Sequence, residues 1–160
     1  MIAFLLIASN SQADSDKYRS IDFNDGGLSL QIPYEWVYFP PSQIHGDLFN
    51  IEVRIKARDE YESFEDELGK IETFHSTLAK TVKENQYYTL LKREPFETKS
   101  GTYGLKSIYG YSDAKPSSIS YFFQNKTGDF IEIRLRFRRW ETNEVWKNID
   151  NIILNGLSLK

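Results

Sequence analysis

The 160-residue sequence contains no cysteine and only two histidines. Without cysteine, the chain has no disulfide framework, no thiol nucleophile, no cysteine-based zinc site and no residue to carry a lipid anchor. The net charge of −3 argues against a dedicated nucleic-acid binder, because such a protein needs a positive field to capture phosphates. Glycine-rich phosphate loops and nucleophile elbows are also missing from the sequence. These absences favour a non-catalytic protein without metal or cofactor.

Long apolar runs are equally scarce, and the clearest one lies at the N-terminus. Ile2 to Ala8 is apolar, and Ser11-Gln12-Ala13 then places small residues where a signal peptidase would cut before Asp14. We therefore expect residues 1–13 to be the remnant of a signal peptide on a protein exported to the periplasm or the extracellular space. No basic residue precedes the short run, so an upstream start codon is part of this expectation; a buried N-terminal strand is the alternative. The run is too short for stable membrane insertion.

The remaining chain is predicted to be a flexible N-terminus over residues 14–26 and a single domain over residues 27–160. Residues 27–32 and 48–57 alternate between apolar and polar side chains, as half-buried strands do. From Ser63 to Val82 the apolar spacing becomes helical, and Ser63 with Asp66 forms a capping-box pattern. Four strands are then predicted at residues 87–97, 102–111, 118–124 and 129–138, and a C-terminal helix at 142–154.

This order predicts an α+β fold. Short links between consecutive strands imply antiparallel pairing, which gives an antiparallel sheet of about six strands. We expect a long helix and the C-terminal helix to flank this sheet, with the long helix on its apolar face. Residues 42–47 are expected to form a loop, and Gly69, inside the long helix, to allow a close packing contact.

One stretch of sequence also resembles a known superfamily. Gly27 to Trp36, a strand ending in Ile-Pro and followed by Trp, is similar to the opening motif of PsbP-like and Mog-type proteins. Glu67 to Gly69, Ser120 to Phe123 and Leu157 to Leu159 fall where that superfamily places its helix, meander and last segment. The resemblance spans residues 27–159 and implies a layered α+β sandwich with a binding or assembly role. Members include extrinsic photosystem II subunits, Ran-binding proteins, secretion-effector chaperones and DcrB-type bacterial envelope proteins, although this chain lacks the lipobox cysteine of envelope lipoproteins.

The sharpest candidate site is a row of basic side chains. In a strand over residues 129–138, arginines alternate with Ile131, Ile133 and Leu135, so they point to the face opposite the core. Basic residues on two other strands are predicted to share this phase. The open face would bind an acidic segment of another protein through Arg54, Lys56, Lys106, Arg134, Arg136 and Arg138. The alternative is a solvated face held together by cross-strand Glu–Arg pairs.

Two rival functions stay open. A hydrolase would use His75 or His45, and would need one of them to meet a serine, an aspartate or a metal in a pocket. A carrier of a small apolar ligand would need an apolar cavity of about 300 Å³ or more. The sequence assigns no catalytic residue. Asn125-Lys126-Thr127 forms a glycosylation sequon, which matters only in a eukaryotic secretory route.

Overall fold

The computed structural model describes residues 17–23, 27–58, 63–71, 73, 89–110, 116–137 and 143–160. The expected signal segment, residues 1–13, lies outside these ranges, as do His75 and Arg138.

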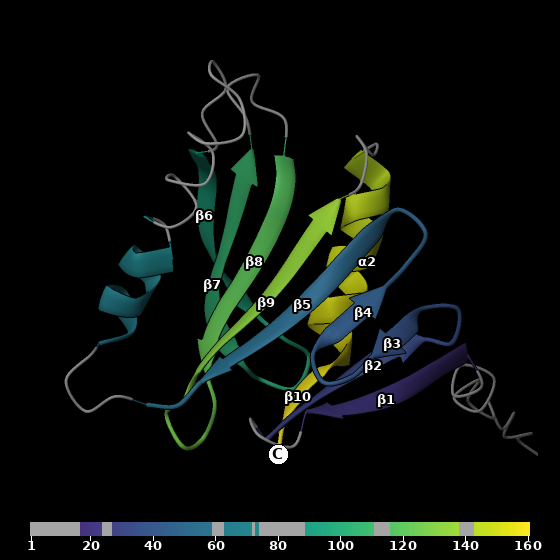
Figure 1. The fold of residues 1–160 in the computed structure, drawn as a ribbon, viewed down its shortest axis with the longest axis horizontal. Coiled ribbons are helices and arrows are strands. Elements are labelled where there is room, and N and C mark those ends of the chain that lie inside the picture. The colour runs from purple at the N-terminus through teal and green to yellow at the C-terminus, as the bar shows by residue number, and fades with distance from the viewer. Residues whose placement is uncertain are drawn as a thin grey trace, which may run out of the picture.

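Two antiparallel sheets make up most of the described structure (Figure 1). The larger sheet has seven strands, in the spatial order β3 (Val37–Phe39), β4 (Gln43–His45), β5 (Phe49–Lys56), β9 (Phe130–Phe137), β8 (Pro116–Gln124), β7 (Tyr103–Gly110) and β6 (Thr89–Glu97). The smaller sheet has three strands, in the order β1 (Tyr18–Phe23), β2 (Leu28–Pro33) and β10 (Leu157–Leu159).

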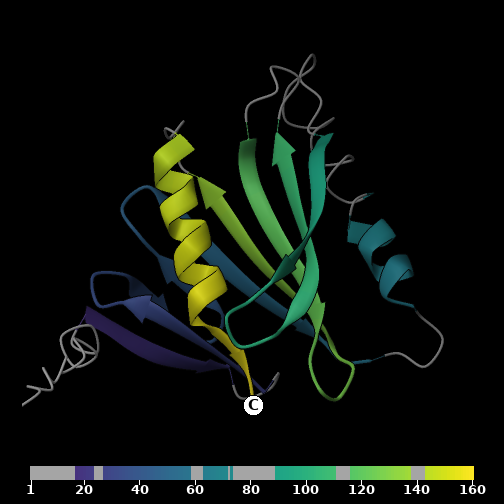
Figure 2. The same ribbon diagram turned by 180° about the vertical axis from the view of Figure 1, so that it is seen from behind.

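The helix α2 (Asn143–Gly156) lies behind the larger sheet in Figure 1 and crosses it in front in Figure 2. Its Ile149 and Ile153 are buried in one apolar cluster with Leu30 of β2 and with Ile133 and Leu135 of β9. The main core therefore lies between α2, the smaller sheet and one face of the larger sheet. We call this face of the larger sheet the core face and the opposite one the outer face.

The predicted fold class, a sheet of about six strands flanked by a long helix, is wrong. Seven strands and three strands form two separate sheets. Residues 35–39 were expected to be a short extended piece, and Val37–Phe39 form β3 within it. Gln43–His45, expected in a loop, form the additional strand β4, which pairs with both β3 and β5. Two more additional strands belong to the smaller sheet, where β1 and β10 both pair with β2.

The expected flexible N-terminus also needs correction over part of its length. Tyr18–Phe23 form β1, whose Ile21 and Phe23 are buried. Alternation of these two apolar side chains with Ser20 and Asp22 is the strand pattern that explains this. Residues 14–16 and 24–26 lie outside the described ranges.

The helix that starts after Ser63 is described over residues 64–71 and packs on the outer face rather than on the core face. Its Leu68 is buried against Phe122 and Phe130, with Phe64 and Ile71 beside it. The capping box is confirmed: the Asp66 backbone N–H donates to Ser63 Oγ at 3.1 Å, and the Ser63 N–H donates to Asp66 Oδ2 at 3.1 Å. Among the described residues the expected close contact at Gly69 is absent, because a Cβ there would meet none of their atoms within 4 Å.

Candidate functional site

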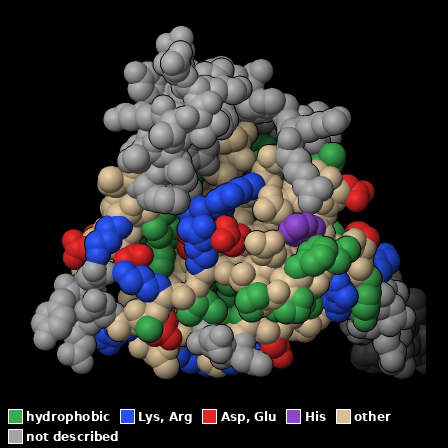
Figure 3. All heavy atoms as spheres, viewed as in Figure 1, with side chains coloured by type: hydrophobic (Ala, Val, Ile, Leu, Met, Phe, Trp, Pro, Cys, Tyr) green, Lys and Arg blue, Asp and Glu red, His purple; other side chains and the backbone are tan. Residues whose placement is uncertain are grey.

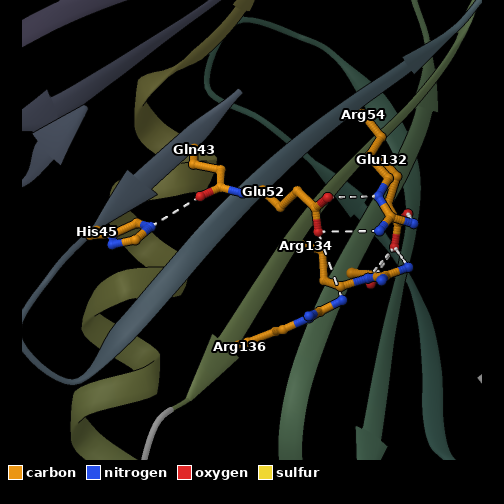
Figure 4. Close-up of polar contacts among 8 residues, drawn as sticks. Gln43, His45, Glu52, Arg54, Glu132, Arg134 and Arg136 are labelled. Atoms are coloured by element: carbon orange, nitrogen blue, oxygen red, sulfur yellow. Dashed lines mark hydrogen bonds and ion pairs between the residues drawn. The ribbon is translucent and has the colours of Figure 1, made fainter. Parts of the chain in front are cut away.

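The candidate site is a group of acidic and basic side chains on the outer face of β5 and β9. These two strands pair along their whole length, so Glu52 lies opposite Arg134, Arg54 opposite Glu132, and Asn50 opposite Arg136. Two of these three pairs bring opposite charges together across the strands, an arrangement that stabilises a sheet. We call Glu52, Arg54, Glu132, Arg134 and Arg136 the Glu–Arg cluster; its side chains converge in Figure 4.

The exposed part of the cluster is formed by two arginines that share Glu52. Arg54 donates to this carboxylate through Nε, at 3.1 Å, and through Nη2, at 3.3 Å. The Nη2 atom of Arg136 lies 3.7 Å from Glu52 Oε2, which is too long for a strong hydrogen bond. The two arginine side chains are 43% and 46% exposed. Solvent can therefore reach both guanidinium groups, and the one on Arg136 is only loosely paired.

Arg134, by contrast, is completely buried. Its Nε donates to Glu132 Oε1 at 2.7 Å, and Ser120 Oγ donates to the same oxygen at 2.9 Å. Its Nη2 also lies 2.7 Å from Glu132 Oε1, in an ion pair without hydrogen-bond geometry. Burial lowers the pKa of Arg134, and the neighbouring Glu132 carboxylate opposes that shift. Arg134 therefore belongs to an internal ion pair, and its predicted place on an open surface is wrong.

Lys106 lies on the core face, not with the arginines. In the strand register it is opposite Tyr121, which is in turn opposite Ile133. Its Nζ is 2.9 Å from Glu94 and 3.2 Å from Asp150 of α2. Burial alone would lower the pKa of Lys106, but the hydrogen bonds and charges of Glu94 and Asp150 outweigh burial and raise it. The side chain thus joins the helix to the sheet and is closed to a partner.

Of the remaining predicted basic residues, Lys56 is separated from the cluster and Arg138 lies outside the described ranges. Lys56 forms an ion pair with Glu67, which lies on the helix over residues 64–71. Both side chains line a pocket of about 300 Å³ with Arg58, Ser63, Phe64 and Gln124. Because charged and polar groups make up much of this lining, the pocket does not suit a small apolar ligand.

His45, a candidate for hydrolysis, lies on β4 beside the cluster. Its Nε2 is 3.3 Å from Gln43 Oε1, and its ring lies 4.7 Å from the ring of Phe39, centroid to centroid. Neither of these two contacts supplies the nucleophile or the carboxylate of a hydrolytic triad.

An exposed apolar patch next to His45 was missed by the sequence analysis. Val37 and Phe39, both on β3, are 51% and 49% exposed. Figure 3 shows apolar side chains beside the purple histidine, with basic and acidic side chains on its other side. The sequence did contain a sign of this patch, because Val37-Tyr38-Phe39 is a short apolar stretch that two prolines end. Its alternate side chains, Val37 and Phe39, had no predicted core to pack against.

Within the described ranges, no three histidine, aspartate or glutamate side chains are placed to hold a metal ion. In the same part of the chain, every helix is too short or too polar to cross a membrane.

Comparison with solved structures gives a clear match to the fold. The solution structure of cyanobacterial PsbP (CyanoP) from Synechocystis sp. PCC 6803 is similar with a TM-score of 0.61, over 90% of this chain and 93% of that chain. The chain has a PsbP-like fold. Sequence identity is 12%, so the similarity shows the fold alone. Comparison with protein-family models and with curated protein sequences gives no match. The predicted PsbP-like resemblance is confirmed, whereas the finer likeness to Mog-type and DcrB-type proteins stays a prediction.

Proposed function

We propose that the protein is an exported, non-catalytic binding or assembly protein that captures an acidic segment of another protein with Arg54 and Arg136. The carrying observation is the loosely paired, half-exposed guanidinium of Arg136 next to Arg54. The Glu–Arg cluster holds three arginines and two glutamates, so it has one positive charge more than it has negative charges. An incoming carboxylate can replace the long contact from Arg136 to Glu52 with a shorter, bidentate one.

Export to the periplasm or the extracellular space, with a bacterial envelope as the setting, is the localisation that goes with this proposal. Its support is the apolar run and the small residues of the first thirteen positions. The PsbP-like fold supports the non-catalytic part of the proposal by analogy, because the family that the sequence resembles implies a binding or assembly role.

The proposal is tested by measuring the affinity of a defined acidic probe, a fluorescein-labelled octaglutamate peptide. Reversing both charges, in Arg54→Glu with Arg136→Glu, should weaken binding about tenfold, because two attractive contacts become repulsive. Wild-type binding should also weaken between about 0.05 and 0.3 M salt, as screened surface charges do.

The matched control reverses two other exposed charges, in Lys126→Glu with Lys147→Glu. This variant has the same net charge as the test variant but leaves the cluster untouched. If the two double variants bind the peptide equally well, attraction comes from overall charge and the proposed site is refuted.

A further inference from the structure

The exposed apolar patch and the Glu–Arg cluster share one face of one sheet. The strand register places Val37 opposite His45, His45 opposite Asn50, and Asn50 opposite Arg136. Side chains in such a row point to the same face. In the described part of the sheet β3 is the edge strand, so the row runs from an apolar edge to a cationic centre.

The separation of these two ends can be estimated from sheet geometry. Three steps between neighbouring strands, each about 4.8 Å, place Val37 and Arg136 about 14 Å apart. An extended peptide rises about 3.3 Å per residue, so about four residues cover this distance. Polar side chains that can bond to a peptide backbone, those of Gln43, His45 and Asn50, lie between the ends.

We infer that the row binds an extended protein segment in which an apolar residue and an acidic residue are about four positions apart. This inference rests on the proposed function and adds the shape and spacing of the partner. The apolar residue covers Val37 and Phe39, and the acidic residue reaches Arg136. Charge complementarity selects the direction of the segment, because only one end of the row carries the guanidinium groups.

The test uses two fluorescein-labelled peptides of identical composition. The spaced peptide has a phenylalanine and a pair of glutamates four positions apart, separated by serines; the adjacent peptide has the phenylalanine next to the glutamates. Because only the spaced peptide can reach both ends of the row, it should bind about fivefold more tightly.

Substitutions separate the two ends. Val37→Ser with Phe39→Ser should reduce the affinity for the spaced peptide to that for the adjacent one, while Arg136→Glu should weaken the binding of both. The matched control is Leu90→Ser, which removes an exposed apolar side chain from the strand β6 at the other edge of the sheet. It should leave both affinities unchanged, and circular dichroism should show that each variant is folded.

Equal affinity for the two peptides, or no binding of either, overturns the inference; the octaglutamate result then decides separately on the proposed function. If Val37→Ser with Phe39→Ser abolishes binding while Arg136→Glu has no effect, the result supports binding at the apolar patch but refutes the arginine site. A concentration-dependent dimer that Phe39→Ser dissociates would show that a second copy of the chain covers the patch, which also overturns the inference.

Discussion

At the scale of single residues, the most consequential finding is the difference between Arg134 and Arg136, which lie two positions apart on β9. Arg134 and Arg136 have the same predicted phase, yet one side chain is completely buried and the other is 46% exposed. The buried guanidinium is balanced by Glu132, which also accepts a hydrogen bond from Ser120. Removing one partner of such a pair leaves an uncompensated buried charge, which costs far more than the pair contributes.

Arg134→Met should therefore destabilise the protein by about 3–5 kcal/mol, because the only cation that the buried Glu132 then keeps is Arg54, through the long, 3.8 Å contact to its Nη1. Urea denaturation of wild type and variant measures this change. The charge reversal Arg134→Glu should be at least as harmful, because Arg134 is buried and does not lie on the open face that the sequence had predicted for it.

The control for this prediction removes both charges, in Glu132→Gln with Arg134→Met. It should recover much of the lost stability, since no buried charge remains. If Arg134→Met alone proved as stable as wild type, the Arg134 side chain would have to be exposed to solvent and not buried.

The sequence could show which positions of β9 alternate, but not which polar positions are covered. The sequence correctly predicted that the core face carries Ile131, Ile133 and Leu135. When apolar side chains recur on one face of a strand, that face is expected to pack against the core. The phase of β7 was misjudged because both of its faces carry apolar residues, Leu105 on one and Ile108 on the other. A strand buried on both faces loses the alternation that fixes its phase, and Lys106 was assigned to the wrong face as a result.

At the scale of elements, two glycines in different surroundings show how packing decides a substitution. Gly69, in the helix over residues 64–71, has no atom of the described part of the chain within 4 Å of the position that a Cβ would occupy. Gly104, in β7, has the Phe122 backbone oxygen at 2.2 Å and a ring atom of Phe96 at 2.8 Å from that position. The first glycine only lowers helix propensity, whereas the second allows two strands and an aromatic ring to pack closely.

Gly69→Ala should raise the free energy of unfolding by about 0.5–1 kcal/mol, because alanine favours the helix and meets no obstacle. Gly104→Ala should lower it by about 1–3 kcal/mol, because backbone must shift to admit the methyl group. Chemical denaturation measures the free energy of unfolding of the two variants. If both substitutions changed it in the same direction, the packing around these two glycines would be contradicted.

The side chain of Leu68 tests the outer-face position of the same helix. It is buried against Phe122 and Phe130, so Leu68→Ala should cost about 2–5 kcal/mol. Glu65→Ala, an exposed change on the same helix, is the control and should cost much less. An equal, small effect of both changes on the melting temperature would show that this helix does not pack on the sheet in solution. The sequence predicted where this helix starts and how its apolar side chains are spaced. It did not show which face of the sheet the helix packs on, because both faces carry apolar side chains.

At the scale of the whole molecule, α2 lies between the two sheets, and one buried carboxylate binds it to the larger sheet in addition to its apolar side chains. Tyr121 of β8 donates a hydrogen bond to Asp150 Oδ1, and Lys106 of β7 lies at 3.2 Å from Asp150 Oδ2. On its other side α2 packs against β2, and its chain continues directly into β10. These long-range links could not be read from the sequence, because Asp150 is 29 residues from Tyr121 and 44 from Lys106.

This polar link makes the stability of the whole fold sensitive to alkaline pH. Burial, followed by the negative charge of Asp150, raises the pKa of Tyr121 well above its ordinary value. Above about pH 10 the unfolded chain loses a phenol proton that the folded chain keeps, so stability falls as pH rises. The raised pKa of Lys106 acts in the same direction, since the folded chain also holds that proton to higher pH.

Tyr121→Phe should therefore be less stable than wild type at neutral pH, where its hydrogen bond to Asp150 is lost, but should lose less stability between about pH 9 and 11. Unfolding free energies measured by urea denaturation across this range give the two slopes. Tyr34→Phe is the matched control, because it removes a phenol that is 57% exposed, and it should keep the wild-type slope. If Tyr121→Phe also kept that slope, the phenol of Tyr121 would titrate alike in the folded and unfolded chains, and the buried link from the sheet to α2 would not form in solution.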